Sequence, residues 1–210
     1  MNYVALGDSV SIDDYTGVAG GGAASQFANA IAAGDFQMLA FDGCTSENAL
    51  VKLRDVEGKP DVVTLTVGGN DILKVVWWGC SVSWEEEVPL EGLERRIGAF
   101  LKVIVGQLSA YACPVILNTI YDPTDGDDEH AMELLFTPQV RDVLLATNEC
   151  IRELGERRGH PVADLERLFR GHGFWSSDPW LVKHLEPNLA GATAIAREWT
   201  RLYRDRVERA

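Results

Sequence analysis

The sequence lacks several features that mark other classes of protein. It has only four cysteines in 210 residues, with no Cys-x-x-Cys pair and no histidine at zinc-ligand spacing. Nothing in it therefore demands a zinc site or a disulfide framework. It also contains neither the Gly-x-x-x-x-Gly-Lys-Ser/Thr loop of nucleotide-binding proteins nor a Gly-x-Gly-x-x-Gly turn. We predict that the protein uses no metal and no cofactor.

Long apolar runs and positive charge are also scarce. No stretch approaches the ~20 apolar residues that cross a bilayer, and the N-terminus shows no basic segment followed by an apolar one. The chain has 19 Lys and Arg against 32 Asp and Glu, a net charge of −13. Such an acidic surface repels nucleic acid and anionic membranes. We expect a cytoplasmic protein that binds neither, and the sequence predicts no particular oligomeric state.

Short apolar runs alternate with longer segments of helical periodicity along the whole chain. The predicted strands are Tyr3–Leu6, Phe36–Phe41, Val62–Val67, Val115–Ile120 and Pro161–Asp164. The predicted helices are Ala23–Ala33, Ser46–Val56, Leu90–Ala112, Pro138–Arg158 and Asn188–Val207. Such alternation is typical of a parallel sheet with helices on both faces. We predict a single α/β domain over residues 1–210, a flavodoxin-like three-layer α/β/α sandwich with a five-stranded parallel sheet.

Three residues suited to binding a negative charge follow successive predicted strands. Ser9 follows the first strand in "LGDSVS", Gly43 follows the second, and Asn70 follows the third in "VGGNDIL". Ligands of such sheets bind beyond the carboxyl ends of the strands, where backbone N–H groups and amide side chains stabilise developing negative charge. Taken singly, each residue is also typical of a turn or a helix cap. Their succession at three strand ends favours a functional site.

These segments resemble the signature blocks of the SGNH (GDSL-type) hydrolase superfamily. The matching residues are "GDSVS" at 7–11, Gly43, and "GGND" at 68–71, and the resemblance covers essentially the whole chain. It implies a serine esterase that works through an acyl-enzyme, with Ser9 as nucleophile. The Ser9 N–H, Gly43 and Asn70 would form its oxyanion hole. The implied substrate is a small ester, a thioester or an acetylated carbohydrate.

The last block departs from the pattern of the superfamily, which usually carries Asp-x-x-His-Pro before the C-terminal helix. Here Glu186 stands at the His position and Lys183 at the Asp position. Because a serine hydroxyl is a weak nucleophile without an adjacent base, another base is needed. We first expect His172 to be this base, with Glu186 orienting it. The alternatives are His184 as base with Asp178 as its acid, Glu186 acting directly, or an impaired site.

Two further interpretations stay open. The connection after the third strand carries Trp77, Trp78 and Trp84, which form either an apolar wall over Ser9 or a cover for the core. The replaced histidine also leaves room for a second function, a non-catalytic protein on a hydrolase scaffold that binds an acyl or carbohydrate ligand. A flavodoxin-like nucleotide binder fits the topology alone, and a fold does not imply a function.

Overall fold

The computed structural model describes residues 1–78, 90–131 and 136–207. Its central sheet has five parallel strands in the order β2-β1-β3-β4-β5, and Tyr3 on β1 pairs with Phe36 of β2 on one side and Val62 of β3 on the other. The strands are β1 (Asn2–Gly7), β2 (Asp35–Met38), β3 (Val62–Thr66), β4 (Val115–Asn118) and β5 (Val162–Ala163). The predicted five-stranded parallel sheet is confirmed.

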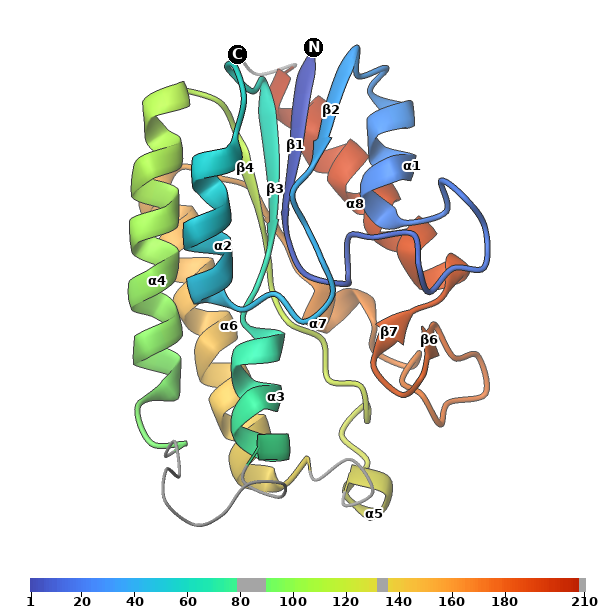
Figure 1. The fold of residues 1–210 in the computed structure, drawn as a ribbon. Helices are drawn as coiled ribbons and strands as arrows, with labels where there is room; N and C mark the ends of the chain where they lie inside the picture. The colour runs from blue at the N-terminus through green and yellow to red at the C-terminus, as the bar shows by residue number, and fades with distance from the viewer. Residues whose placement is uncertain (79–89, 132–135, 208–210) are drawn as a thin grey trace.

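Helices cover both faces of this sheet (Figure 1), with α2, α4 and α6 on one face and α1 and α8 on the other. They are α1 (Ala23–Ala30), α2 (Ser46–Lys52), α3 (Gly69–Trp78), α4 (Leu93–Leu108), α5 (Asp128–Ala131), α6 (Pro138–Arg158), α7 (Leu165–Leu168) and α8 (Leu189–Val207). Short 3-10 turns, Leu53–Asp55 and Ser109–Tyr111, follow α2 and α4. The predicted three-layer α/β/α sandwich is therefore also confirmed.

Two elements at the carboxyl edge of the sheet differ from the prediction. The segment after the third strand was expected to be a long connection, but its first part forms α3, in which Ile72 is buried. A small antiparallel pair, β6 (Leu181–Val182) and β7 (Glu186–Pro187), precedes α8. Strands of two residues are too short to produce a recognisable periodicity. Both unpredicted elements carry residues of the candidate site described below.

Alternate residues of each strand face two separate apolar cores. Val4 and Leu6 belong to the core beneath α2, α4 and α6, whereas Tyr3 and Ala5 belong to the core beneath α1 and α8. This follows from the alternation of side chains along a strand. Because helices cover both faces, all five residues of β3 are buried, which explains its near-continuous apolar sequence. The sheet is thus a fully covered scaffold whose carboxyl edge positions the site.

Gly7 ends β1 immediately before the turn that carries Ser9. Its φ is +141°, and a Cβ there would lie 2.0 Å from the carbonyl oxygen of Thr66 on β3. We expect Gly7→Ala to lower the free energy of unfolding by more than about 3 kcal/mol in urea denaturation, because the two strands must separate.

Gly43→Ala is the matched control for this variant. Gly43 also has a positive φ, +74°, but nothing lies within 4 Å of a Cβ built on it. Only the backbone strain of the left-handed conformation then applies, about 1–2 kcal/mol. Equal losses of stability in the two variants would contradict the close approach of β1 and β3.

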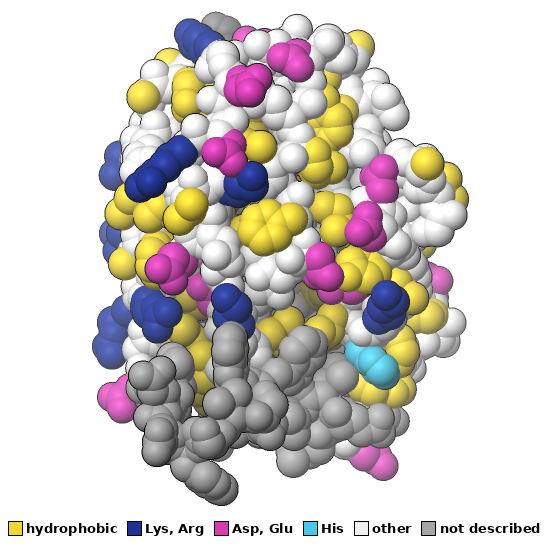
Figure 2. All heavy atoms as spheres, viewed as in Figure 1, with side chains coloured by type: hydrophobic (Ala, Val, Ile, Leu, Met, Phe, Trp, Pro, Cys, Tyr) yellow, Lys and Arg dark blue, Asp and Glu magenta, His cyan; other side chains and the backbone are white. Residues whose placement is uncertain are grey.

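The surface carries the acidic surplus of the chain. On the face shown in Figure 2, acidic side chains are spread over the whole height, whereas Lys and Arg lie mostly toward the side of α2 and α4. None of the described helices is long and apolar enough to cross a membrane.

Cys44, Cys113 and Cys150 are free thiols, and Cys80 lies outside the described residues.

Candidate active site

A cavity opens at the carboxyl edge of the sheet, where the strand-end rule predicted a site. Its empty space is about 710 Å³, including the open mouth. Ser9 lines it from the turn after β1, Asn70 from the first turn of α3, and Glu186 from β7. Three segments far apart in the sequence therefore meet at one cavity.

The turn after β1 holds Ser9 in a fixed position. The Ser9 side chain is 7% exposed, and the Ser9 carbonyl accepts a hydrogen bond from the Ile12 N–H at 3.3 Å. On β3, the Thr66 hydroxyl accepts from the Asp8 N–H at 3.1 Å and lies 2.9 Å from the Ser11 hydroxyl. The turn is thus anchored to the neighbouring strand on both sides of Ser9.

Glu186 lines the same cavity as Ser9, and hydrogen bonding by the Ser9 hydroxyl is one of the influences that lower the pKa of its carboxyl group. Glu186 starts β7 and pairs with Val182 of β6. Just before it, the Leu185 carbonyl accepts a hydrogen bond of 2.6 Å from the Tyr121 hydroxyl. The short hairpin and this hydrogen bond hold the Glu186 backbone at the edge of the cavity.

The environment of Glu186 makes it a stronger base than an ordinary glutamate. Burial raises the pKa of Glu186, and the negative charge of Asp42 adds to the rise, whereas the Ser9 hydrogen bond and Lys183 oppose it. The net effect is a pKa above the usual value. Burial likewise raises the pKa of Asp8 to about 7, with a contribution from the charge of Glu186. A carboxylate with a raised pKa holds a proton more firmly and is better suited to general base catalysis.

Asn70 is positioned beside the turn that contains Gly43. The Asn70 side-chain amide donates to the Cys44 carbonyl at 3.2 Å, and an amide has a second N–H with which to reach a substrate oxygen. The Asp71 carboxylate accepts from the Ser46 N–H at 2.8 Å and the Ser46 hydroxyl at 2.6 Å. These bonds hold the 43–46 segment against α3. An oxyanion hole of Ser9, Gly43 and Asn70 stays a prediction.

His172 does not join Ser9 in the structure. Its ring stacks on Trp180 with the centroids 3.6 Å apart, and its Nδ1 lies 2.9 Å from the carbonyl oxygen of Asp178 and 3.3 Å from its carboxylate. His172 is absent from the lining of the Ser9 cavity. The structure therefore does not bring His172 into the cavity that Ser9 and Glu186 line, because its ring stacks on Trp180, and the roles of these three residues stay a prediction.

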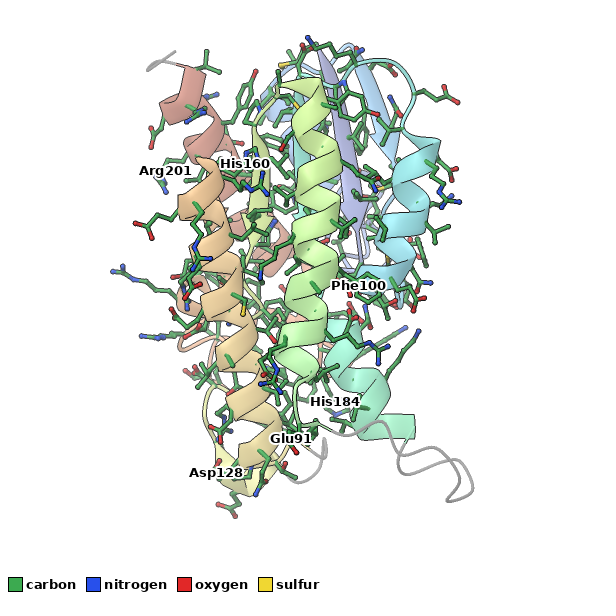
Figure 3. The ribbon with its side chains drawn as sticks, turned by 90° about the vertical axis from the view of Figure 1, so that its left-hand side faces the viewer. Glu91, Phe100, Asp128, His160, His184 and Arg201 are labelled. Carbon is green, nitrogen blue, oxygen red and sulfur yellow. The ribbon has the colours of Figure 1, made fainter. Side chains whose placement is uncertain are left out.

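The alternative base, His184, also lies outside the lining of the Ser9 cavity and contacts other residues. It is exposed, its backbone is left-handed with φ +70°, and its ring packs against Phe174 at a centroid distance of 4.3 Å. Asp178, the acid expected to accompany it, pairs with His172 instead. Figure 3 shows His160 and His184 toward opposite ends of the molecule. None of the three histidines whose side chains are described lines the Ser9 cavity.

Sequence reasoning missed two residues that position this site. Tyr121 fixes the segment before Glu186, and Asp71 fixes the turn that precedes α2. Both follow strands of the sheet, so the strand-end rule could have singled them out. Trp77 and Trp78 end α3, but their side chains, and all of Trp84, lie outside the described residues. The predicted tryptophan wall therefore stays a prediction.

Comparisons with known proteins agree with this architecture. The model of the GDSL-like lipase/acylhydrolase family matches residues 5–194. Among solved structures, an extracellular lipase from Streptomyces rimosus is 19% identical with a TM-score of 0.73, covering 96% of this chain and 99% of the lipase. A phospholipase A1 from Streptomyces albidoflavus NA297 is 18% identical with a TM-score of 0.71, covering 96% of this chain and 98% of the phospholipase.

A third similar structure is an acetylxylan esterase, Axe2, from Geobacillus stearothermophilus. It is 16% identical with a TM-score of 0.70, and the match covers 96% of this chain and 93% of the esterase. At such identities the structures show a shared fold. No curated protein sequence matches the chain. The family model spans nearly the whole chain, and the chain belongs to the GDSL-like lipase/acylhydrolase family and is an esterase.

Proposed function

We propose that this esterase hydrolyses a small carboxylic ester through an acyl-enzyme on Ser9, with Glu186 as its general base. The observation that supports this most strongly is that Ser9 and Glu186 line one cavity at the sheet edge, where the Ser9 hydroxyl is a hydrogen-bond donor that lowers the pKa of Glu186. A nucleophilic serine needs a base within hydrogen-bond reach. Glu186 satisfies that requirement, whereas the described histidine side chains lie outside the cavity lining.

In the first half of the reaction, the Ser9 oxygen bonds to the carbonyl carbon of the ester while its proton passes to Glu186. The carbonyl oxygen becomes an oxyanion, which the N–H groups of Ser9 and Gly43 and the Asn70 amide stabilise. When this intermediate collapses, the bond to the alcohol oxygen breaks and Glu186 returns the proton to the leaving alcohol. A water molecule then attacks the acyl-enzyme by the same route, releasing the acid and restoring Ser9.

Lys183 and Asp42 adjust the base in opposite directions. The Lys183 ammonium lies over the Tyr15 ring, 4.9 Å from its centroid, and the Tyr15 hydroxyl donates to Asp42 at 2.7 Å. Tyr15 thus holds both charged groups near Glu186, where Lys183 lowers its pKa and Asp42 raises it. Lys183, at the position of the usual triad aspartate, therefore favours the ionised form of the base.

The pH dependence of hydrolysis tests the role of Glu186. Because Glu186 must be ionised to accept a proton, kcat/KM for p-nitrophenyl butyrate should fall about tenfold per pH unit below its pKa. Since burial raises that pKa, this acid limb should lie above the ~4.3 of an ordinary glutamate. Initial rates measured from pH 4 to pH 9 would show at which pH kcat/KM begins to fall.

Two variants predict the direction in which the acid limb of the pH profile moves. Asp42→Asn should move the limb to lower pH and Lys183→Met to higher pH, because each removes a charge that acts on Glu186. If the base is a carboxylate, its pKa and therefore the acid limb should scarcely move on warming. If the base is an imidazole, its pKa falls on warming and the limb moves to lower pH. Lack of any hydrolysis, or a limb that keeps its position in both variants and falls steadily on warming, would overturn the assignment.

A further inference from the structure

The cavity continues past Ser9 into an apolar region at the end of the sheet. Its lining there comes from the residue after β3, from α3, from the segment after β4, and from α6 and the segment just before it. The residues are Val67, Ile72, Leu73, Ile120, Phe136 and Leu144. Most of these side chains are buried in the core. An apolar surface binds hydrocarbon well, but it leaves the hydroxyl groups of a sugar without hydrogen-bond partners.

The polar side chains Asn118 and Thr119, which also line this cavity, already form hydrogen bonds within the protein. The Asn118 amide donates to the Leu65 carbonyl at 3.0 Å, and its oxygen accepts from the Trp199 indole at 2.7 Å. The Thr119 hydroxyl lies 3.1 Å from the Asp164 carboxylate and accepts from the Glu166 N–H at 3.0 Å. These groups therefore add little capacity to bind a polyol.

The two ends of the cavity suit the two parts of an ester. Figure 1 shows β7 on one side of the carboxyl edge of the sheet, with α3 and α6 toward the other. The leaving alcohol must depart toward Glu186, because that residue returns the proton to it. The acyl chain then extends the other way from Ser9, toward Ile72 and Leu144.

We propose that this apolar end of the cavity is an acyl-chain pocket, and that the enzyme prefers esters of medium-chain aliphatic acids to acetyl esters of carbohydrates. The proposal rests on the proposed role of Ser9 as nucleophile. Each methylene buried in an apolar pocket contributes about 0.8 kcal/mol, roughly fourfold in kcat/KM. Lengthening the acyl chain from acetate to butyrate should therefore raise kcat/KM by at least about tenfold, and hexanoate should be better still.

A series of p-nitrophenyl acetate, butyrate, hexanoate and octanoate tests the pocket with a constant leaving group. A second series, ethyl against hexyl acetate, varies only the alcohol. A rise in the first series and little change in the second supports the proposal. Acetate hydrolysed as well as hexanoate, or a rise only in the second series, overturns the acyl pocket while leaving the esterase in place. Lack of hydrolysis of every ester would instead overturn the proposed function.

Leu73 offers a variant on the wall of the pocket. It is half-buried on α3 and lines the cavity, whereas its neighbour Lys74 is exposed and does not. Leu73→Trp should lower the ratio of hexanoate to acetate kcat/KM by at least tenfold, because the larger side chain narrows the pocket. Leu73→Ala should lower the same ratio by several-fold, because the acyl chain loses its contact with the leucine. Lys74→Trp, the matched control, should keep the wild-type ratio. Unchanged ratios in both folded Leu73 variants would contradict the pocket.

Discussion

Replacing Ser9 by alanine is expected to lower kcat/KM for p-nitrophenyl butyrate by at least ~10⁴-fold while the protein stays folded. Without the hydroxyl no acyl-enzyme can form, and only the residual effect of binding and the oxyanion donors remains. The change deletes one oxygen from a residue that is 7% exposed and lines the cavity. Initial rates together with thermal unfolding monitored by circular dichroism would measure both effects.

Ser25→Ala provides a matched control for this variant. Ser25 lies in α1, is half-buried like many surface serines, and does not line the Ser9 cavity. It should keep the wild-type rate within about twofold, since nothing in the reaction contacts it. Hydrolysis retained by a folded Ser9→Ala protein would show that another group is the nucleophile.

Glu186→Gln has the second largest expected effect, a loss of about 10²–10⁴-fold in kcat. Glutamine has nearly the same size and can still contact the Ser9 hydroxyl, but it cannot accept its proton. The stability of the variant distinguishes loss of the base from damage to the fold. Because burial raises the pKa of Glu186, its ionised form destabilises the fold at neutral pH. The glutamine variant should therefore melt at the same or a higher temperature while losing activity.

His172→Ala is the counterpart of the Glu186 variant. Its ring stacks on Trp180 and contacts Asp178 outside the cavity lining, so kcat should stay within about threefold of wild type. A large loss of kcat in His172→Ala, with Glu186→Gln as active as wild type, would restore the histidine as base.

The sheet could be predicted because its strands carry their own signal. The five residues of β3 are all buried between two helical layers, and this is why they form a near-continuous apolar run. The segment after Asn70 was interpreted as a long connection, and turn chemistry was considered for Gly68, Gly69 and Asn70 before it. In the structure only two residues, Val67 and Gly68, separate β3 from α3, which begins at Gly69. Glycine at a helix start is tolerated, so the turn signal and the helix overlap.

The location of the candidate cavity could also be predicted, whereas the position of His172 could not. Ser9 and Asn70 follow strands directly, so the strand order alone brings them to one edge. The position of His172 depends on the path of the loop before β6 and on its stacking against Trp180, neither of which leaves a periodic signal in the sequence. Glu186 was noted for its position in the last block, and its contact with Ser9 depends on the two-residue hairpin that places it.

We propose that Glu186, and not a histidine, activates Ser9. The most direct test is the rate at which a fluorophosphonate labels Ser9, followed by intact-protein mass spectrometry with peptide mapping. We expect a single adduct on Ser9, formed equally fast in wild type and His172→Ala and at least about 100-fold more slowly in Glu186→Gln. Rapid labelling of Glu186→Gln together with loss of labelling in His172→Ala would contradict it.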